Sequence, residues 1–483
     1  MKVFQKATAA IRRLLPQSKF ARGVSVLVGG TAGSQLLMVI AAPLLTRLYT
    51  PKDFGLLAIF VGLLAMFASI ASLRYEGAIP LPEDDLEAAN VAVLCLLAVL
   101  LVTTVSAALV VFGGSAIANL LGAPTLKKYF WLLPIGVFSL GTYQVFYYWA
   151  LRHKSFAAMT NVRLKQSFTA TIIQLAGHKL GVAALLSGYV SGLSLAALLM
   201  AKSGLRHREF RQVSISGILK AAKRYRRFPI YSTWSGLFNT AGSELPPLLF
   251  ATFFNPAAAG LYSLTNRVLA MPMSIIGGAI GNVFLASAAE AHRERRLAPL
   301  VTTVHDKLAH IAMPPAMVFM MAGPELFAFV FGENWREAGA FAQWMAPWLY
   351  VTFITSPLST LIIVLEKQRH DLAFEVILLT VRVATLAVGG VIGDLLITVA
   401  LFSMGSMLCW VGFLIWITVH SGNTVHSLIK PTLSALAWGI LCIAPLEFGV
   451  FLMQGTPGWI VALMATGILI STRYYFLLRQ AYS

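Results

Sequence analysis

Charged residues are scarce in this sequence of 483 residues. They make up 12% of the chain, against roughly 25% in a soluble globular domain, while apolar residues reach 58%. A soluble protein of this length could not cover its surface with so few charges, so a soluble fold is excluded. The apolar residues also stand in blocks of about 20, the length that a helix needs to cross a bilayer.

Several kinds of functional site are missing from the sequence as well. The three cysteines, Cys95, Cys409 and Cys442, all lie in apolar blocks and are too few for a disulfide framework or a metal site. There is no Gly-x-x-x-x-Gly-Lys run, which argues against direct use of ATP, and no cofactor is predicted. The longest polar stretch, 202–228, is too short to fold alone. This argues against an enzyme with a soluble catalytic domain.

We therefore predict an all-α polytopic membrane protein of about fourteen transmembrane helices, because barrel strands would alternate apolar and polar residues and these blocks do not. The weakest span is 157–178, whose Asn161, Arg163 and Lys165 must face protein or water if it crosses the membrane fully. The predicted spans are 24–46, 54–73, 88–112, 129–150, 157–178, 181–201, 229–253, 258–286, 307–331, 338–364, 373–392, 395–419, 431–453 and 458–478.

The positive charges gather on one side of these spans. Of the 37 lysines and arginines, 29 lie on the side of the N-terminus, six lie on the other side, and Arg267 and Arg382 fall inside spans. Cytoplasmic loops carry such an excess, so we expect both chain ends in the cytoplasm and the protein in the bacterial inner membrane. The net charge of +18 then reflects topology and predicts no nucleic-acid partner.

Residues 1–22 are basic and are not predicted to be a cleavable signal, because no long apolar run or small-residue cleavage site precedes the first span. Their apolar residues lie roughly on one helical face. This fits a short amphipathic helix on the cytoplasmic surface, with membrane lipids as its partner. A disordered basic tail is the open alternative.

A shift of 205 positions aligns the first half of the chain with the second. Both copies start on the same side of the membrane, so the repeat is parallel, with a pseudo-two-fold axis along the membrane normal. The shift pairs Lys19 with Arg224, Tyr49 with Phe254, Pro51 with Pro256 and Gly55 with Gly260. The predicted parts are an N-terminal six-helix lobe at 23–201, a basic linker at 202–228, a second six-helix lobe at 229–419 and two accessory helices at 420–483. A cleft between two such lobes is where transporters bind substrate and alternate access.

Two neighbouring segments carry a family resemblance. Residues 43–55 read PLLTRLYTPKDFG, and residues 73–82 read LRYEGAIPLP. Together they resemble the N-terminal signature of bacterial polysaccharide-biosynthesis membrane proteins, the Wzx-like oligosaccharide flippases of the multidrug/oligosaccharidyl-lipid/polysaccharide exporter superfamily. The resemblance implies translocation of an undecaprenyl-diphosphate-linked oligosaccharide to the outer leaflet for polysaccharide biosynthesis. H+ or Na+ are then candidate coupling ions, and other glycan-assembly membrane proteins are candidate partners.

Such a substrate needs a hydrated cationic path, because a desolvated diphosphate is very costly and arginine grips phosphate oxygens in bidentate fashion. Arg267 and Arg382 each lie about ten residues into a span, near mid-membrane, and are predicted to contact substrate. For Arg382, an ion pair with Glu375 two turns earlier is the alternative. For Arg267, Glu244 could be a partner from the preceding span.

Arg74 and Glu76 belong to the signature and lie at the cytoplasmic end of the second span, where we expect them to line the entrance. Arg47, at the other mouth, is more simply explained by a side chain that snorkels to the interface.

The span 229–253 carries a polar stripe at spacings of three and four, which fits either a cavity wall or ordinary helix packing. The stripe consists of Ser232, Ser235, Asn239 and Ser243. Of these, Ser235 and Asn239 are predicted substrate contacts. For ion coupling, an intramembrane carboxylate is the usual site. Glu244 is the first candidate, followed by Glu76 and Glu375.

Two other functions are alternatives. An ion-coupled drug or metabolite antiporter of the multidrug and toxin extrusion type would predict acidic rather than cationic cavity residues, and the first span holds no carboxylate. A membrane-embedded glycan polymerase or ligase would need catalytic groups on a substantial external loop, whereas the predicted outer loops are short. We therefore predict a transporter rather than an enzyme.

Overall fold

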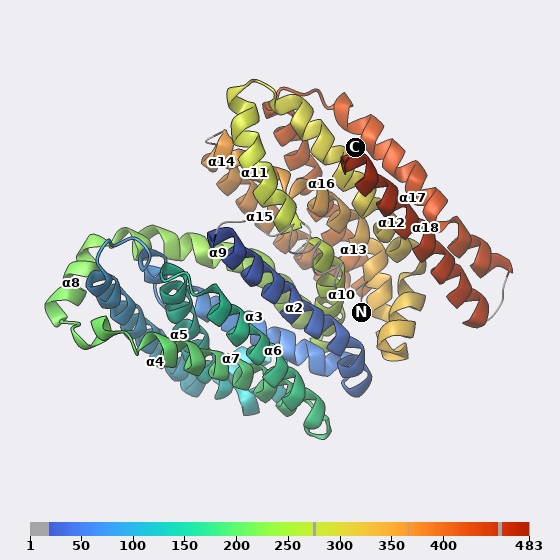
Figure 1. Ribbon diagram of the computed structural model, residues 1–483. Helices are drawn as coiled ribbons and strands as arrows, with labels where there is room; N and C mark the ends of the chain where they lie inside the picture. The colour runs from blue at the N-terminus through green and yellow to red at the C-terminus, as the bar shows by residue number, and fades with distance from the viewer. Residues whose placement is uncertain (1–18, 274–276, 366, 453–455, 483) are drawn as a thin grey trace, which may run out of the picture. The chain divides into compact units, whose positions relative to one another are not determined.

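The computed structural model describes residues 19–482 except 274–276, 366 and 453–455, and these residues form helices joined by short turns (Figure 1). The all-α prediction is confirmed. Most of the predicted amphipathic segment 1–22 lies outside the described residues. The chain divides into two compact units, Met1–Gly260 (unit 1) and Leu261–Ser483 (unit 2).

Unit 1 runs from blue to light green in Figure 1. Its helices are α2 (Lys19–Leu48), α3 (Pro51–Ile70), α4 (Asp85–Leu120), α5 (Leu132–Arg152), α6 (Phe156–Ala176), α7 (Val182–Gly204), α8 (Ile215–Arg224), α9 (Thr233–Phe253) and the first turn of α10 (Pro256–Pro272). Short turns join them at η1 (Tyr75–Ala78), η2 (Pro124–Tyr129), η3 (His178–Leu180), η4 (Arg208–Arg211) and η5 (Phe228–Ser232).

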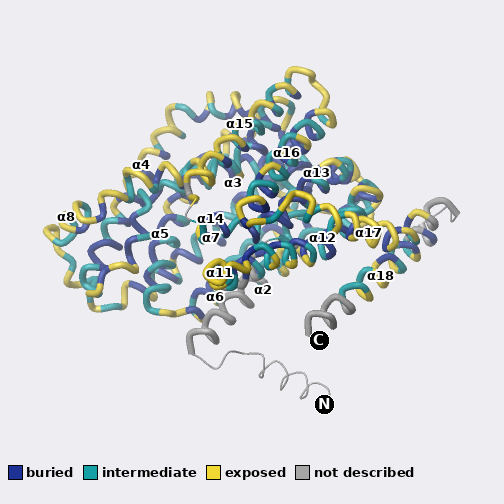
Figure 2. The backbone as a smooth tube through the Cα atoms, turned by 90° about the horizontal axis from the view of Figure 1, so that it is seen from above, coloured by how far each residue is buried: buried dark blue, intermediate teal, exposed yellow. Residues whose placement is uncertain are grey.

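Unit 2 runs on to red in Figure 1. After the rest of α10 it contains α11 (Gly278–Arg293), α12 (Leu297–Phe331), η7 (Glu333–Trp335), α13 (Arg336–Thr355), η8 (Leu358–Thr360), α14 (Leu361–Val364), α15 (Gln368–Ile392), α16 (Leu395–His420), α17 (His426–Leu452) and α18 (Thr456–Tyr482). Buried and exposed residues alternate along most of these helices in Figure 2, as expected where one face packs on neighbouring helices.

Every predicted span falls on a helix or on two consecutive helices. The span 258–286 falls on α10 and α11, and the span 338–364 bends by 42° between α13 and α14. Pro357 explains the bend, because it has no N–H for the carbonyl of Phe353. By length and hydropathy alone, seven of the described helices can cross a membrane, or eight if the bent pair counts as one span. The chain is a multi-pass membrane protein, and the number of fourteen stays a prediction.

The starts of α3 and α10 are built alike. Thr50 caps α3 by accepting a hydrogen bond from the backbone N–H of Asp53, and Pro51 follows as the first helical residue. Asn255 accepts from the N–H of Ala258 in the same way, and Pro256 begins α10. A polar cap before proline fixes a helix start, since proline lacks the N–H that would be unsatisfied there. The two helix starts are thus capped in the same way, and the repeat itself stays a prediction.

Candidate functional site

Unit 1 contains a cavity of about 490 Å³, which we call the Arg74 cavity. This volume is within the range of small-molecule sites, roughly 300–1,000 Å³. Its walls combine charged, amide, hydroxyl and aromatic groups. They come from the turn after α3, from α5, from η5 and from α9. The lining residues are Arg74, Glu76, Gly77, Tyr148, Phe228, Tyr231, Ser232, Ser235, Gly236 and Asn239.

Arg74 reaches the cavity because the chain turns sharply after α3. Leu73 and Arg74 both adopt the left-handed conformation, with φ of 52° and 61°. This region costs about 1–2 kcal/mol for each residue other than glycine. Such strain persists only where the surroundings enforce it, and it is often found at functional sites. The turn ends α3 and begins η1, and it leaves the Arg74 side chain 35% exposed.

Glu76 is the acidic member of the site and is only 4% exposed. Its Oε1 lies 3.8 Å from Nη1 of Arg74, and Ser72 donates a hydrogen bond to its other oxygen, Oε2. Tyr75, which lies between Arg74 and Glu76 in the sequence, is buried. This burial raises the pKa of its phenol, which therefore stays neutral. The site thus pairs a largely buried carboxylate with a more accessible guanidinium.

The guanidinium of Arg74 lies directly on the backbone of α9. A Cβ atom built on Gly236 would stand 2.1 Å from Nη2 and 2.3 Å from Nε of Arg74, so only glycine leaves room for this contact. One helix turn away, Thr240 donates to the carbonyl of Gly236. The contact joins the turn after α3 to α9, and both residues line the cavity.

The aromatic wall comes from η5, which is a π-helical turn, and from α5. Pro229 lacks an N–H and so disturbs the ordinary hydrogen-bond pattern where η5 leads into α9. Phe228 packs on Gly77, whose Cβ would lie 3.2 Å from the Phe228 ring. Tyr148 and Tyr231 complete the aromatic lining. Single π-turns are frequent at functional sites.

The polar stripe predicted on 229–253 runs along this wall. Its first three members, Ser232, Ser235 and Asn239, line the Arg74 cavity, whereas Ser243 is exposed and donates to the carbonyl of Thr240. Glu244 lies further along α9, where α3 crosses it closely. A Cβ on Gly62 of α3 would be 3.4 Å from the carbonyl oxygen of Glu244. Thus Arg74, Glu76, Ser235 and Asn239 come together, and Glu244 lies at the α3–α9 crossing.

Arg382 lies in unit 2, on α15. Its guanidinium carbon stands 5.3 Å from the ring centre of Trp348 and 5.8 Å from that of Phe402, and its Nε donates to Ser406 over 3.4 Å. Trp348, Phe402 and Ser406 are all buried. Stacking on aromatic faces is a favourable setting for a guanidinium. Arg382 is thus held within the core of unit 2.

The other two predicted residues of unit 2 lie elsewhere on it. Arg267 is exposed on α10, and Glu375 is half-buried on α15, two turns before Arg382. No group of three or more His, Cys, Asp or Glu side chains suited to a metal ion occurs in the part of the chain that the structure describes.

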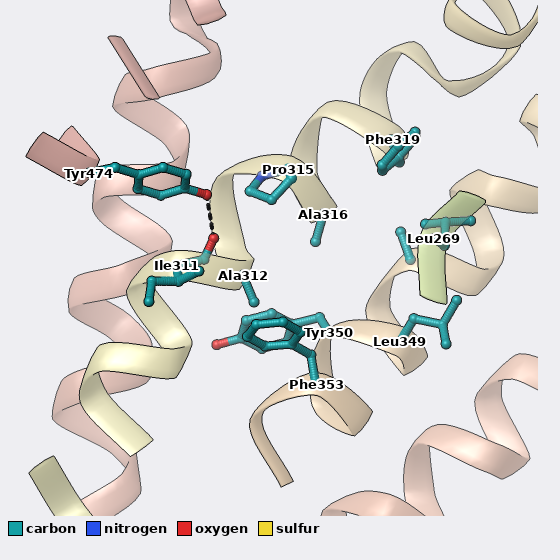
Figure 3. A pocket seen from close by; sticks show the side chains of 11 residues that line it. Leu269, Ile311, Ala312, Pro315, Ala316, Phe319, Leu349, Tyr350, Phe353 and Tyr474 are labelled. Atoms are coloured by element: carbon teal, nitrogen blue, oxygen red, sulfur yellow. Dashed lines mark hydrogen bonds between the residues drawn. The ribbon is translucent and has the colours of Figure 1, made fainter. Parts of the chain in front are cut away.

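A second cavity, of about 250 Å³, lies in unit 2 and is almost entirely apolar (Figure 3). Its lining includes Leu269, Phe319 and Leu349. At one edge, Tyr474 of α18 donates a hydrogen bond of 2.6 Å to the carbonyl oxygen of Ile311. Pro315 has no N–H for that carbonyl, so the tyrosine replaces the missing helical hydrogen bond. No charged side chain lines this cavity, so it suits an apolar group and not a phosphate.

Comparison with known proteins places the chain in a family. The sequence profile of the family described as polysaccharide biosynthesis protein matches residues 44–340, well over half of the chain. The chain belongs to this family. The resemblance seen at 43–55 and 73–82 is thereby confirmed, and the match includes every residue that lines the Arg74 cavity. No curated protein matches the chain.

Solved structures agree with this member of the polysaccharide biosynthesis family in fold. The lipid II flippase MurJ, in an inward closed conformation, is similar with a TM-score of 0.75 and 12% identity, over 95% of this chain and 99% of that one. The Vibrio cholerae MATE transporter VcmN is similar with a TM-score of 0.50 and 14% identity, over 83% of this chain and 96% of that one. At such identities the likeness shows the fold alone.

One residue of this polysaccharide biosynthesis protein stands out that the sequence did not indicate. Arg152, at the end of α5, is nearly buried and binds the loop that carries the signature. It donates to the carboxylate of Asp85 over 2.7 Å and to the carbonyl oxygens of Pro82 and Glu83 over 2.5 and 3.1 Å. The sequence does not reveal this role, because the partners of Arg152 are mostly backbone atoms some seventy residues earlier and form no side-chain pattern. The only signal was an arginine at the end of an apolar span.

Proposed function

We propose that the protein is a flippase that moves an undecaprenyl-diphosphate-linked oligosaccharide from the inner to the outer leaflet of the bacterial inner membrane. It would serve the assembly of a polysaccharide such as O-antigen or exopolysaccharide. Both chain ends would lie in the cytoplasm, on the side that holds most of the lysines and arginines. Transport would proceed by alternating access and without catalysis.

The Arg74 cavity is the observation that carries this proposal. It brings an accessible arginine together with serine and asparagine side chains inside a membrane protein of a polysaccharide biosynthesis family. A guanidinium binds a diphosphate, while hydroxyl and amide groups can hydrogen-bond sugar hydroxyls. Because Arg74 follows the cytoplasmic end of the second predicted span, the cavity would receive the head group from the inner leaflet.

The same arrangement suits a charged head group better than a cationic drug. The carboxylate of Glu76 is buried and already bonded to Ser72, whereas the guanidinium of Arg74 is the more accessible charge. An incoming anion would therefore meet a positive group first. This favours the flippase over the antiporter alternative.

Further contacts in unit 2 remain proposals. Arg267, which is exposed on α10, would meet the diphosphate during translocation. Arg382 would do so only if the substrate enters between the aromatic rings that now hold it. For coupling to H+ or Na+, Glu244 at the α3–α9 crossing is our first candidate, followed by Glu76 and Glu375.

The deciding experiment measures the sidedness of lipid-linked oligosaccharide in cells that contain or lack the protein. Depletion should trap undecaprenyl-diphosphate glycans in the inner leaflet, and wild-type protein should release them. Arg74→Ala should fail to release them while inserting normally, and Arg74→Lys should restore part of the transport, because charge survives while bidentate grip is lost. Arg211→Ala removes an exposed arginine elsewhere in unit 1 and should transport normally.

Two outcomes would contradict the proposal. Glycans that reach the outer leaflet normally without the protein, in cells with no second flippase, would remove the flippase function and favour an antiporter. Full transport by Arg74→Ala would keep the function but exclude the Arg74 cavity as its site.

A further inference from the structure

Arg74 occupies a position that leaves much of its hydrogen-bonding capacity unused. A guanidinium carries five N–H donors. In the described part of the chain, the one ion pair of Arg74 is with Glu76, and its N–O distance of 3.8 Å is too long for a good hydrogen bond. The Nε atom of Arg74 is buried and has no acceptor among the described residues. A buried donor without a partner is costly and rare in native proteins.

The side chain stays there because it fits against α9. Gly236 offers a surface without a Cβ, and the flat guanidinium lies on it at contact distance. The left-handed backbone of Leu73 and Arg74 directs the side chain towards this surface. The position is thus enforced by shape and by backbone geometry rather than by strong hydrogen bonds.

A diphosphate would offer the acceptors that this position lacks. Its oxygens can take two parallel hydrogen bonds from one guanidinium. To make them, the guanidinium must turn away from Gly236 towards the cavity, where its side chain is already 35% exposed. Glu76 cannot compete fully for it, because one of its oxygens is already bonded to Ser72.

We propose that Arg74 has two positions and that Gly236 holds the first of them. Without substrate, the guanidinium rests on Gly236 and ties the end of α3 to α9. When a diphosphate head group enters the cavity, Arg74 leaves Gly236 to bind it, and α9 is released from the turn at 73–78. Gly236 is therefore a positioning residue that links substrate binding to the movement of α9. The inference rests on the proposed function for its ligand, but the resting contact can be tested without any ligand.

The first test is a double-mutant cycle read by thermal unfolding of the purified protein in detergent. Gly236→Ala and Arg74→Ala are made singly and together. Gly242→Ala, on the same helix, is the matched control, since a Cβ there meets nothing within 4 Å. In the Arg74→Ala background, Gly236→Ala should shift Tm as Gly242→Ala does. With Arg74 present, Gly236→Ala should lower Tm measurably more than that control does, but only modestly, because the end of the Arg74 side chain can move aside into the cavity. Additive effects would show that the two residues are not coupled and would overturn the inference.

The second test uses undecaprenyl diphosphate as the probe, with the protein in nanodiscs, together with the transport assay. In the wild-type protein, Arg74 must leave Gly236 before it binds the probe, and this lowers the affinity. Gly236→Ala removes the resting contact, so it should bind the probe several-fold more tightly. It should nevertheless transport glycan at least tenfold more slowly, because binding no longer releases α9. Gly242→Ala should match wild type in both measurements. Tighter binding with slower transport is a result that a merely destabilised protein would not give.

The outcomes separate the two proposals. If Arg74→Ala abolishes probe binding but Gly236→Ala binds and transports like wild type, the flippase site stands and the two-position arginine is wrong. If Arg74→Ala binds and transports normally, the proposed site itself is wrong, whatever the unfolding cycle shows. Should Gly236→Ala fail to fold, the double variant with Arg74→Ala replaces it, because the atoms in the way of the new Cβ belong to Arg74. Recovery of folding in the double variant is the expected result, and failure of the double variant to fold would contradict the inference.

Discussion

Gly55 and Gly260 make a reciprocal contact. A Cβ on Gly55 would lie 1.5 Å from the carbonyl oxygen of Pro256, and a Cβ on Gly260 would lie 1.9 Å from the carbonyl oxygen of Pro51. Each glycine thus faces the proline that precedes the other by four residues. The shift of 205 positions aligns these same residues. Two equivalent turns that touch each other's equivalent atoms are related by a local two-fold axis, which supports the proposed repeat.

Alanine at either glycine should be strongly destabilising. The atoms in the way belong to backbone, which cannot move aside as a side-chain end can, and overpacking typically costs about 1–3 kcal/mol. We expect Gly55→Ala and Gly260→Ala each to lower Tm in detergent and to reduce the amount of inserted protein. Gly242→Ala, in open space, should do neither. Unchanged Tm in both variants would mean that the two turns are not in close contact in the membrane.

Much of the fold could be predicted from the sequence because lipid, rather than water, surrounds the spans. A helix is the main way to satisfy the backbone there, so each apolar block became a helix, and the prolines and polar caps fixed where helices start. Helix ends and breaks were harder to predict. The block 338–364, for example, forms α13 and α14 with a bend of 42° at Pro357, because apolar composition alone does not show how far a proline bends a span.

The candidate site was predictable in part for a related reason. Polar residues in an apolar span are conspicuous, so Ser235 and Asn239 could be predicted from their stripe, and Arg74 could be predicted from the family signature. What could not be predicted was the role of residues with no polar side chain. Gly236 matters through the space it leaves, and space becomes visible only when a neighbouring helix is placed beside it.

Arg152 should stabilise the loop between η1 and α4, because its guanidinium donates several hydrogen bonds to this loop at once. Hydrogen bonds to a charged group are worth about 1.5–3 kcal/mol, and a lysine cannot reach the carboxylate of Asp85 and the carbonyls of Pro82 and Glu83 together. Arg152→Lys should therefore loosen the loop. Cleavage after Glu83 by a glutamate-specific protease should become at least tenfold faster, with Arg206→Lys, an exposed arginine, as the control. Equal cleavage rates would contradict this role.

Arg382 offers a test between a structural and a substrate-binding role. Its guanidinium is stacked on Trp348 and Phe402, and such cation–π contacts are worth about 0.5–2 kcal/mol. Arg382→Lys should lower the free energy of unfolding by about this amount, because an ammonium cannot stack as a planar group does. Arg267→Lys, at an exposed position, should change it less. If Arg382→Lys unfolds like wild type but binds undecaprenyl diphosphate more weakly, the substrate role is favoured instead.

Two tyrosines of the apolar cavity differ in one respect, and this makes them a matched pair. The hydroxyl of Tyr474 donates to the carbonyl of Ile311, which Pro315 leaves without its helical partner, whereas the hydroxyl of Tyr350 is buried without a hydrogen bond in the described part of the chain. Hydrogen bonds between membrane helices average about 0.6 kcal/mol and reach about 1.7. Tyr474→Phe should be at the upper end, since it leaves a carbonyl unsatisfied in an apolar setting.

Tyr350→Phe should be neutral or slightly stabilising, because it removes a buried polar atom that has no partner there. Thermal unfolding of both variants in the same detergent gives the comparison directly. If the two lowered Tm equally, the phenol of Tyr350 would have a partner in the membrane, and the cavity would hold a polar group. A lower Tm in Tyr474→Phe alone would show that this hydrogen bond joins α18 to α12, at the point where Pro315 interrupts the backbone hydrogen bonds of α12.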